Sequence, residues 1–281
     1  MADVQKSAFS LSSATLMMAP AFTTDVFSLR PDLHSVGMSS EVNVTVDSSV
    51  TSLLNGVAQV TVDSKRTGVS ASITANVYEM TAQNFYRSQA MSGNPVSLKR
   101  LSLTANVASA AVSLTLTANG VPGEASSVPT AASDIPAGST LLIQRANQSD
   151  YLFIATTSAV ATFASGTFTV PIAGSAIPAG MTFSTGDVVW VVDDIPIASM
   201  DSDDTFGVKI VGTLTQFNRP VVAVFPKVRV AKGFQLSFNE TQYTSMPWEL
   251  SPLLLSAGEV ASVTRGAEIG TRSPGLVYVG A

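Results

Sequence analysis

The sequence predicts a mainly β protein, an antiparallel β-sandwich or barrel with one principal α-helix and a small inserted β domain. Polar and apolar residues alternate with a period of two in several stretches, as in strands with one covered face. Only one stretch combines helical periodicity with capping residues at both ends. Charged residues make up 12% of the 281 residues, whereas an ordinary soluble domain has about 25%.

The composition also limits the function. A surface poor in charge is expected where copies of the same chain cover it. The net charge of -5 argues against nucleic-acid binding, which needs a basic stripe. The absence of cysteine excludes thiol catalysis, disulfides and zinc–thiolate sites. Any Ser-His-Asp device must use His34, the single histidine, and no nucleotide-binding glycine motif occurs. We therefore expect no enzyme activity, no cofactor and no metal site.

Residues 1–94 form the first predicted segment, which contains the clearest strands. Residues 41–47 alternate strictly, residues 48–56 should turn the chain, and residues 57–62 should form a second strand. The alternation returns in residues 69–77, so we expect long antiparallel pairing. The polar row consists of Glu41, Asn43, Thr45, Asp47, Ser70, Ser72, Thr74 and Asn76. The apolar row, which should face the core, consists of Val42, Val44, Val46, Val69, Ala71, Ile73, Ala75 and Val77.

The one convincing helix should follow these strands. Thr81 is the predicted N-cap, Gly93 stands where a C-cap is expected, and Pro95 forbids continuation. The predicted apolar face of this helix consists of Ala82, Phe85, Tyr86 and Ala90.

Residues 95–192 form an almost chargeless insertion. The sequences SDIPAG (133–138) and SAIPAG (175–180) echo each other, and each precedes an apolar strand, at 140–143 with 151–155 and at 188–192. Two copies are too few for a solenoid, so a small barrel or sandwich is predicted. The acidic run that follows, residues 193–204, lacks the spacing of a calcium loop. A solvated domain junction is favoured there over an ion site.

The last segment, residues 193–281, should return to the first domain. A strand is predicted at 206–214, and the apolar stretch 221–230 suits a strand that is covered on both faces. A short link at 231–233 should lead to a one-sided strand at 234–238. Residues 241–248 combine polar turn formers with aromatics and indicate a packed corner.

Two separated parts of the chain resemble bacteriophage tail tube (major tail) proteins. The sequences FPKVRV (225–230), FQLSF (234–238) and YTSMPWEL (243–250) resemble the C-terminal part of that family. The sequences QVTVDSK (59–65) and YEMTAQN (78–84), with a serine-rich strand between them, resemble the part where a strand feeds the principal helix. The resemblance covers residues 25–93 and 193–281 and leaves the insertion unexplained.

The resemblance implies a structural virion protein. In that family six subunits form a ring, and the rings stack into a tube that delivers DNA into the host. Implied partners are other copies of the chain, the tape measure protein and tail-end or baseplate proteins. DNA would pass through the lumen without specific binding, and no membrane is involved. The implied location is the virion tail, after synthesis in the bacterial host cytoplasm.

The resemblance also makes the polar row above a candidate for the lumen wall, because strands from every subunit line the lumen in that family. The same row could equally face external solvent. Sixfold repetition would give carboxylate rings at Glu41 and Asp47, which repel DNA. The alternative function is a secreted or surface-displayed immunoglobulin-like β-sandwich binding module, for which low charge and Ser/Thr-rich strands are also natural.

Overall fold

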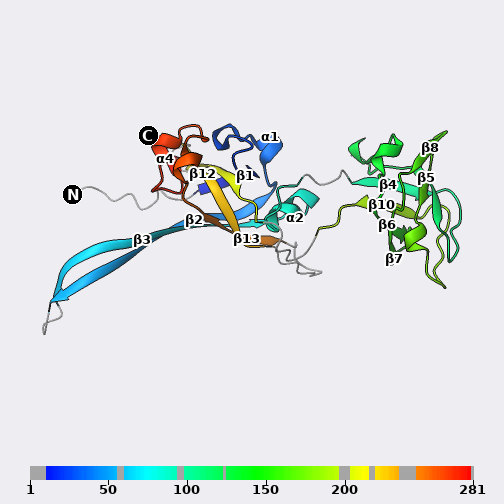
Figure 1. Ribbon diagram of the computed structural model, residues 1–281, viewed down its shortest axis with the longest axis horizontal. Helices are drawn as coiled ribbons and strands as arrows, with labels where there is room; N and C mark the ends of the chain where they lie inside the picture. The colour runs from blue at the N-terminus through cyan, green and yellow to red at the C-terminus, as the bar shows by residue number, and fades with distance from the viewer. Residues whose placement is uncertain are drawn as a thin grey trace. The chain divides into compact units, whose positions relative to one another are not determined.

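The computed structural model describes residues 11–55, 60–93, 98–122, 125–195, 203–214, 219–233 and 245–279. It is mainly β, with 47% strand and 14% helix, and its described strands form two antiparallel sheets, which confirms the predicted fold class. Neither sheet closes into a barrel. The chain divides into two compact units (Figure 1): unit 1 comprises Met1–Gly93 and Pro196–Ala281, and unit 2 comprises Asn94–Ile195.

Unit 1 is built on one sheet in the order β1-β11-β12-β13-β3-β2, and β14 also pairs with β12. The strands are β1 (Leu11–Pro20), β2 (Ser39–Asn55), β3 (Val60–Val77), β11 (Phe206–Leu214), β12 (Arg219–Lys232), β13 (Met246–Pro252) and β14 (Leu276–Val279). The first half of β12 pairs with β14 and its end pairs with β13. Both ends of the sheet contribute to one core, which includes Leu16, Ile73, Phe206, Phe225 and Trp248.

Strand β1 was not predicted, because its sequence does not alternate. Leu16 and Met18 belong to the main core, whereas Met17 and Ala19 pack in a second cluster with Val26 of the short 3-10 helix η1 (Val26–Ser28). A strand that is covered on both faces has a continuous apolar run. In β1 this run covers only residues 16–19, because Ser12, Ser13 and Thr15 interrupt the stretch before it, whereas the stretch at 221–230 is long enough to predict a strand.

Strands β2 and β3 form a longer ribbon than the sequence suggested (Figure 1). The predicted turn at 48–56 is wrong, because β2 continues to Asn55. The two predicted strands 57–62 and 69–77 belong to one strand, β3, from Val60 onward. Serine-rich sequence suggested turns, but Val and Thr favour strand structure when a partner strand is available. A register shift opposite Gly68 and Arg66 keeps the pairing continuous.

The predicted helix is α2 (Ala82–Ser88), and the Thr81 side chain caps it by accepting a hydrogen bond from the Asn84 N–H at 3.2 Å. The predicted C-cap at Gly93 is wrong, since the helix ends at Ser88 and Ala90 takes the left-handed conformation that follows (φ 56°). Phe85 packs against the core as expected. Asn84 is also buried, because its amide donates to the carbonyls of Val36 and Glu79. The other helices described are short: α1 (Pro31–His34), α3 (Ala257–Val260) and α4 (Gly266–Ile269).

The strand predicted at 206–214 is β11, and the one predicted at 221–230 lies within β12. The predicted corner at 241–248 is wrong in its last part, because Met246 and Trp248 are buried residues of β13. The strand predicted at 234–238 lies outside the described residues.

Unit 2 has its own seven-stranded sheet, in the order β7-β6-β10-β4-β5-β9-β8. The strands are β4 (Lys99–Leu103), β5 (Ser113–Ala118), β6 (Thr140–Arg145), β7 (Gln148–Thr156), β8 (Thr162–Ala164), β9 (Thr167–Pro171) and β10 (Val188–Val192). The 3-10 helices η2 (Ala125–Ser127), η3 (Ala132–Asp134) and η4 (Ala173–Ser175) lie between them. The sheet encloses a separate core that includes Leu101, Ile143, Phe168 and Val189.

The two sequence echoes in unit 2 form equivalent turns. Gly138 and Gly180 have φ values of +81° and +87°, which the tight turns require. Ile135 and Ile177 are buried in the core, and their carbonyls accept hydrogen bonds from Ala161 and Ala110, respectively. The echo is therefore a repeated structural element.

In each unit, the point where the chain enters lies close to the point where it leaves. In unit 1 the Ser92 N–H donates to Asp204 Oδ2 at 2.7 Å, and the Asp204 N–H donates to the Ala90 carbonyl at 3.0 Å. In unit 2 Lys99, at the start of β4, pairs with Val191 near the end of β10. The boundaries predicted from the sequence lie after residues 94 and 192.

Candidate functional site

The eight polar residues predicted to face the lumen lie on one face of the β2–β3 ribbon. Asn43, Thr45 and Asp47 on β2 stand opposite Thr74, Ser72 and Ser70 on β3, respectively. Five of these side chains are exposed, and Ser72 is half-buried. The other side of β3 carries the buried residues Ile73, Ala75 and Val77. We call the eight residues, together with Glu249, the polar face.

Glu41 and Asn76 join the polar face through a β-bulge. The register shifts between Ser40 and Asn43, and Glu41 adopts a left-handed backbone conformation (φ 52°). From there its Oε2 accepts a hydrogen bond of 2.7 Å from Asn76 Nδ2. The bulge therefore redirects the Glu41 carboxylate toward β3.

Glu249 on β13 extends the polar face by one strand. It stands opposite Thr74 and also pairs with Lys232 of β12. A shallow pocket of about 150 Å³ lies between these strands, lined by Glu41, Asn76, Lys232 and Glu249 among others. Glu249 was not predicted because it directly follows the corner expected at 241–248. The alternation of buried Met246, Trp248 and Leu250 with Pro247, Glu249 and Ser251 is the signal that could have found it.

The prediction that the β2 valines face the core is wrong for two of the three. Val42 packs against the core, but Val44 is 38% exposed and Val46 is 62% exposed. These two valines line an open apolar groove, which we define by Val44, Val46, Phe225, Leu254 and Val277. Strands β11, β12 and β14 contribute the opposite wall through Ile210, Ala223 and Val277, but a hollow of about 400 Å³ separates them from these valines. The alternation correctly predicted that the valines share one side of β2, but it did not predict that Val44 and Val46 on that side are exposed.

His34, the histidine that a Ser-His-Asp triad would need, ends the short helix α1. The Nδ1 atom of His34 accepts a hydrogen bond from the Arg30 N–H at 3.1 Å. No group of three or more Asp, Glu or His residues that could hold a metal ion occurs among the described residues. Within the acidic run 193–204, Asp194 bonds Thr140 and Asp203 pairs with Arg229. Residues 196–202 lie outside the described residues. No described helix is both long enough and apolar enough to span a membrane.

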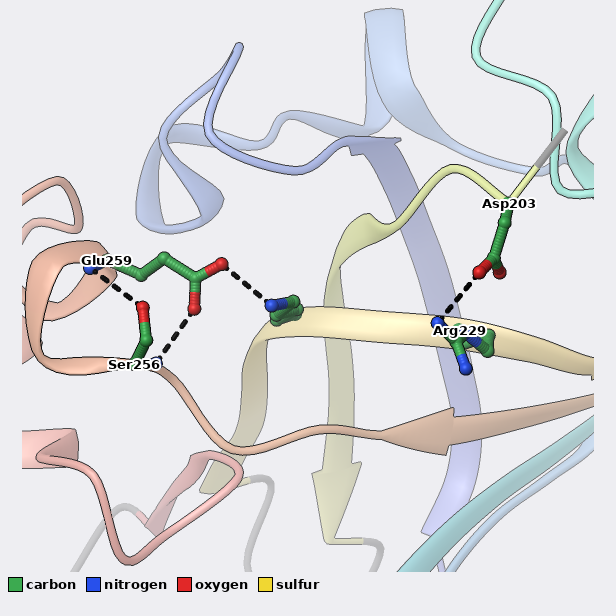
Figure 2. Close-up of polar contacts among 5 residues, drawn as sticks. Asp203, Arg229, Ser256 and Glu259 are labelled. Atoms are coloured by element: carbon green, nitrogen blue, oxygen red, sulfur yellow. Dashed lines mark hydrogen bonds and ion pairs between the residues drawn. The ribbon is translucent and has the colours of Figure 1, made fainter.

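The C-terminal part of unit 1 is held to β12 by a half-buried ion pair. Lys227 Nζ lies 2.7 Å from Glu259 Oε1. Ser256 and Glu259 form a capping box at the start of α3 (Figure 2). The Lys227 hydrogen bond, and then the one from the Ser256 N–H, lowers the pKa of the Glu259 carboxyl to about 2. Figure 2 also shows Asp203 bonded to Arg229, a more exposed pair at 2.8 Å.

Neither the family models nor the curated proteins to which the sequence was compared gave a match.

Proposed function

We propose that this chain is a structural subunit of a bacteriophage tail tube, in which six copies form a ring and stacked rings form the channel for DNA. The observation that carries the proposal is how the resembling parts of the chain fold. Residues 25–93 and 193–281 are far apart in sequence, yet nearly all of both lies in unit 1. The insertion without that resemblance forms unit 2. The division of the chain along the limits of the resemblance supports the proposal.

The polar face supports the channel role. It carries the carboxylates of Glu41, Asp47 and Glu249 over neighbouring strands, and the side chains between them are uncharged. A wall with acidic and neutral groups repels phosphates and offers them nothing to bind. Lys232 stands opposite Glu249 in the strand register, so one cation lies beside the three carboxylates. We propose that this face lines the lumen.

Self-assembly is further supported by the β2–β3 ribbon. The part of β3 before Ile73 pairs with β2 alone among the described strands. A two-stranded ribbon is only marginally stable in water, so it suits a protein that works in contact with other copies. The proposal includes no catalytic activity and no cofactor, and interaction with the tape measure and tail-end or baseplate proteins in the virion.

Negative-stain electron microscopy and sedimentation velocity of the purified full chain test the proposal. The expected result is rings with sixfold symmetry, or tubes made of such rings. A chain that remains monomeric over a wide concentration range, or that forms assemblies without a central channel, would contradict it.

A further inference from the structure

The apolar groove of unit 1 is an uncovered apolar feature near the polar face. Two adjoining cavities of about 670 and 400 Å³ form it, and Val44, Val46 and Val277 line both. Val46 is 62% exposed, Val277 is 60% exposed and Leu254 is 54% exposed. Single exposed apolar residues are ordinary, but a contiguous set around one hollow marks an interaction surface.

The strands beside the groove indicate what kind of partner fits. Among the described strands, β2 pairs only with β3 and β14 pairs only with β12, so each has an edge without a partner strand. A partner with an extended backbone can pair with such an edge while its alternate side chains enter the groove. An extended polypeptide segment satisfies both requirements, because its backbone supplies N–H and C=O groups.

The charge of the groove limits which polypeptide segments can bind in it. Arg272 is the only charged residue that lines either cavity among the described residues. The partner segment must therefore be apolar and nearly uncharged, because a charge without a counterpart is costly to bury. This chain fits, since 12% of its residues are charged and 46% are hydrophobic.

We infer that the apolar groove is a subunit contact, filled by an extended segment of a second copy of this chain. The inference rests on the proposed ring assembly and assigns one surface to it. Each copy would offer its groove to one neighbour and a different surface to the other, which is the heterologous contact that closes a ring. The face of β2 that carries Thr45 and Asp47 stays free for the lumen, because it points away from Val44 and Val46.

Substitution of the full chain tests this surface. Val46→Lys and Val277→Lys change exposed positions and should leave the monomer folded, as checked by circular dichroism and thermal unfolding. Both variants should lose ring formation in sedimentation velocity and electron microscopy. Thr45→Lys is the matched control, because it introduces the same charge one residue away on the opposite face, and it should still form rings.

The outcomes separate the two proposals. Rings formed as efficiently by the groove variants as by the wild type overturn the groove assignment and leave the tube function standing. A wild-type chain that never assembles overturns both.

A photo-crosslinking residue at position 46, in a mixture of isotopically light and heavy chains, identifies the occupant. Crosslinks between light and heavy chains support the inference. Crosslinks confined within one chain, or the absence of a crosslink in assembled rings, overturn it.

Discussion

Glu41 accepts a hydrogen bond of 2.7 Å from Asn76 across the β2–β3 ribbon, and it does so from a left-handed backbone conformation with φ of 52°. For a residue with a Cβ atom, this conformation is higher in free energy than a right-handed one by about 1 kcal/mol or more. The bulge that aims this carboxylate therefore stores a measurable strain.

The strain predicts different effects for two truncations of Glu41. Glu41→Ala loses the hydrogen bond and keeps the strain, so we expect a loss of about 1 kcal/mol in the free energy of unfolding. Glu41→Gly loses the same bond but relieves the strain, so it should be more stable than the alanine variant by about 1 kcal/mol. Urea unfolding with unchanged m-values measures both. Equal stability of the two variants would show that the backbone conformation carries no strain.

The lumen assignment predicts a defect in DNA delivery. Glu41→Lys combined with Asp47→Lys should leave tubes that assemble but eject DNA poorly, because the new cationic rings attract phosphates. The defect should ease as added salt screens the charge. The control is Asp32→Lys with Asp150→Lys, which makes the same charge change at exposed positions outside the polar face. Normal delivery by the first variant, or a tube structure with Glu41 and Asp47 on its outer surface, would refute the assignment.

The Lys227–Glu259 pair predicts a sensitivity to acid. The pKa of Glu259 is lowered to about 2 in the folded chain, from an ordinary value of 4.5. The contribution to stability is therefore complete above pH 4.5 and is lost as the pH falls toward 2. Glu259→Gln should lower the melting temperature at neutral pH and reduce its decline across this interval.

Asp203→Asn serves as the comparison for Glu259→Gln. Both members of the Asp203–Arg229 pair are more than 45% exposed, at 62% and 50%, and exposed ion pairs contribute little. The melting temperature of the Asp203→Asn variant should therefore follow that of the wild type across the same pH interval. A larger effect from Asp203→Asn than from Glu259→Gln would contradict the ranking of the two pairs.

Because the chain enters and leaves each unit at neighbouring points, we predict that unit 2 can be removed without unfolding unit 1. Replacing residues 94–195 by a short Gly/Ser linker should leave unit 1 folded and able to form rings, because Ser92 and Asp204 already hold the two chain ends together. Asp204→Ala in the shortened chain should lower its stability by removing that contact. A shortened chain that folds but forms no rings would place unit 2 in the tube wall.

The sequence predicted those elements that leave a local pattern in the residues, such as alternation, an apolar run or a capping residue. The polar row of β2 and β3 was predicted because alternation reports a difference between the two sides of a strand. Strands β10 and β12 were predicted from their apolar runs. Thr81 was found because a cap has a local cause, the unpaired N–H groups of the first helical turn. These features depend on residues close to one another in the chain.

The features that the sequence did not predict depend on contacts between residues far apart in the chain. β1 was missed because η1 and the main core cover its two faces, and neither cover is visible locally. Val44 and Val46 have the pattern of core residues, but whether a second layer reaches them depends on the paths of β11, β12 and β14. Asn84 is buried because its amide donates to the carbonyl of Val36, which is 48 residues away in the sequence. Periodicity predicts which side of a strand is apolar, but which elements pack against that side depends on the fold.

The pairing of Lys99 with Val191 also bears on the order in which the chain folds. While unit 2 is unfolded, unit 1 must close a loop of 102 residues, from 94 to 195. Each doubling of loop length costs roughly 0.6 kcal/mol of closure entropy, so this loop costs about 2 kcal/mol more than one of about ten residues. Once unit 2 has folded, its two ends are adjacent and the effective loop is short. Early folding of unit 2 therefore favours folding of unit 1 by shortening the loop that unit 1 must close.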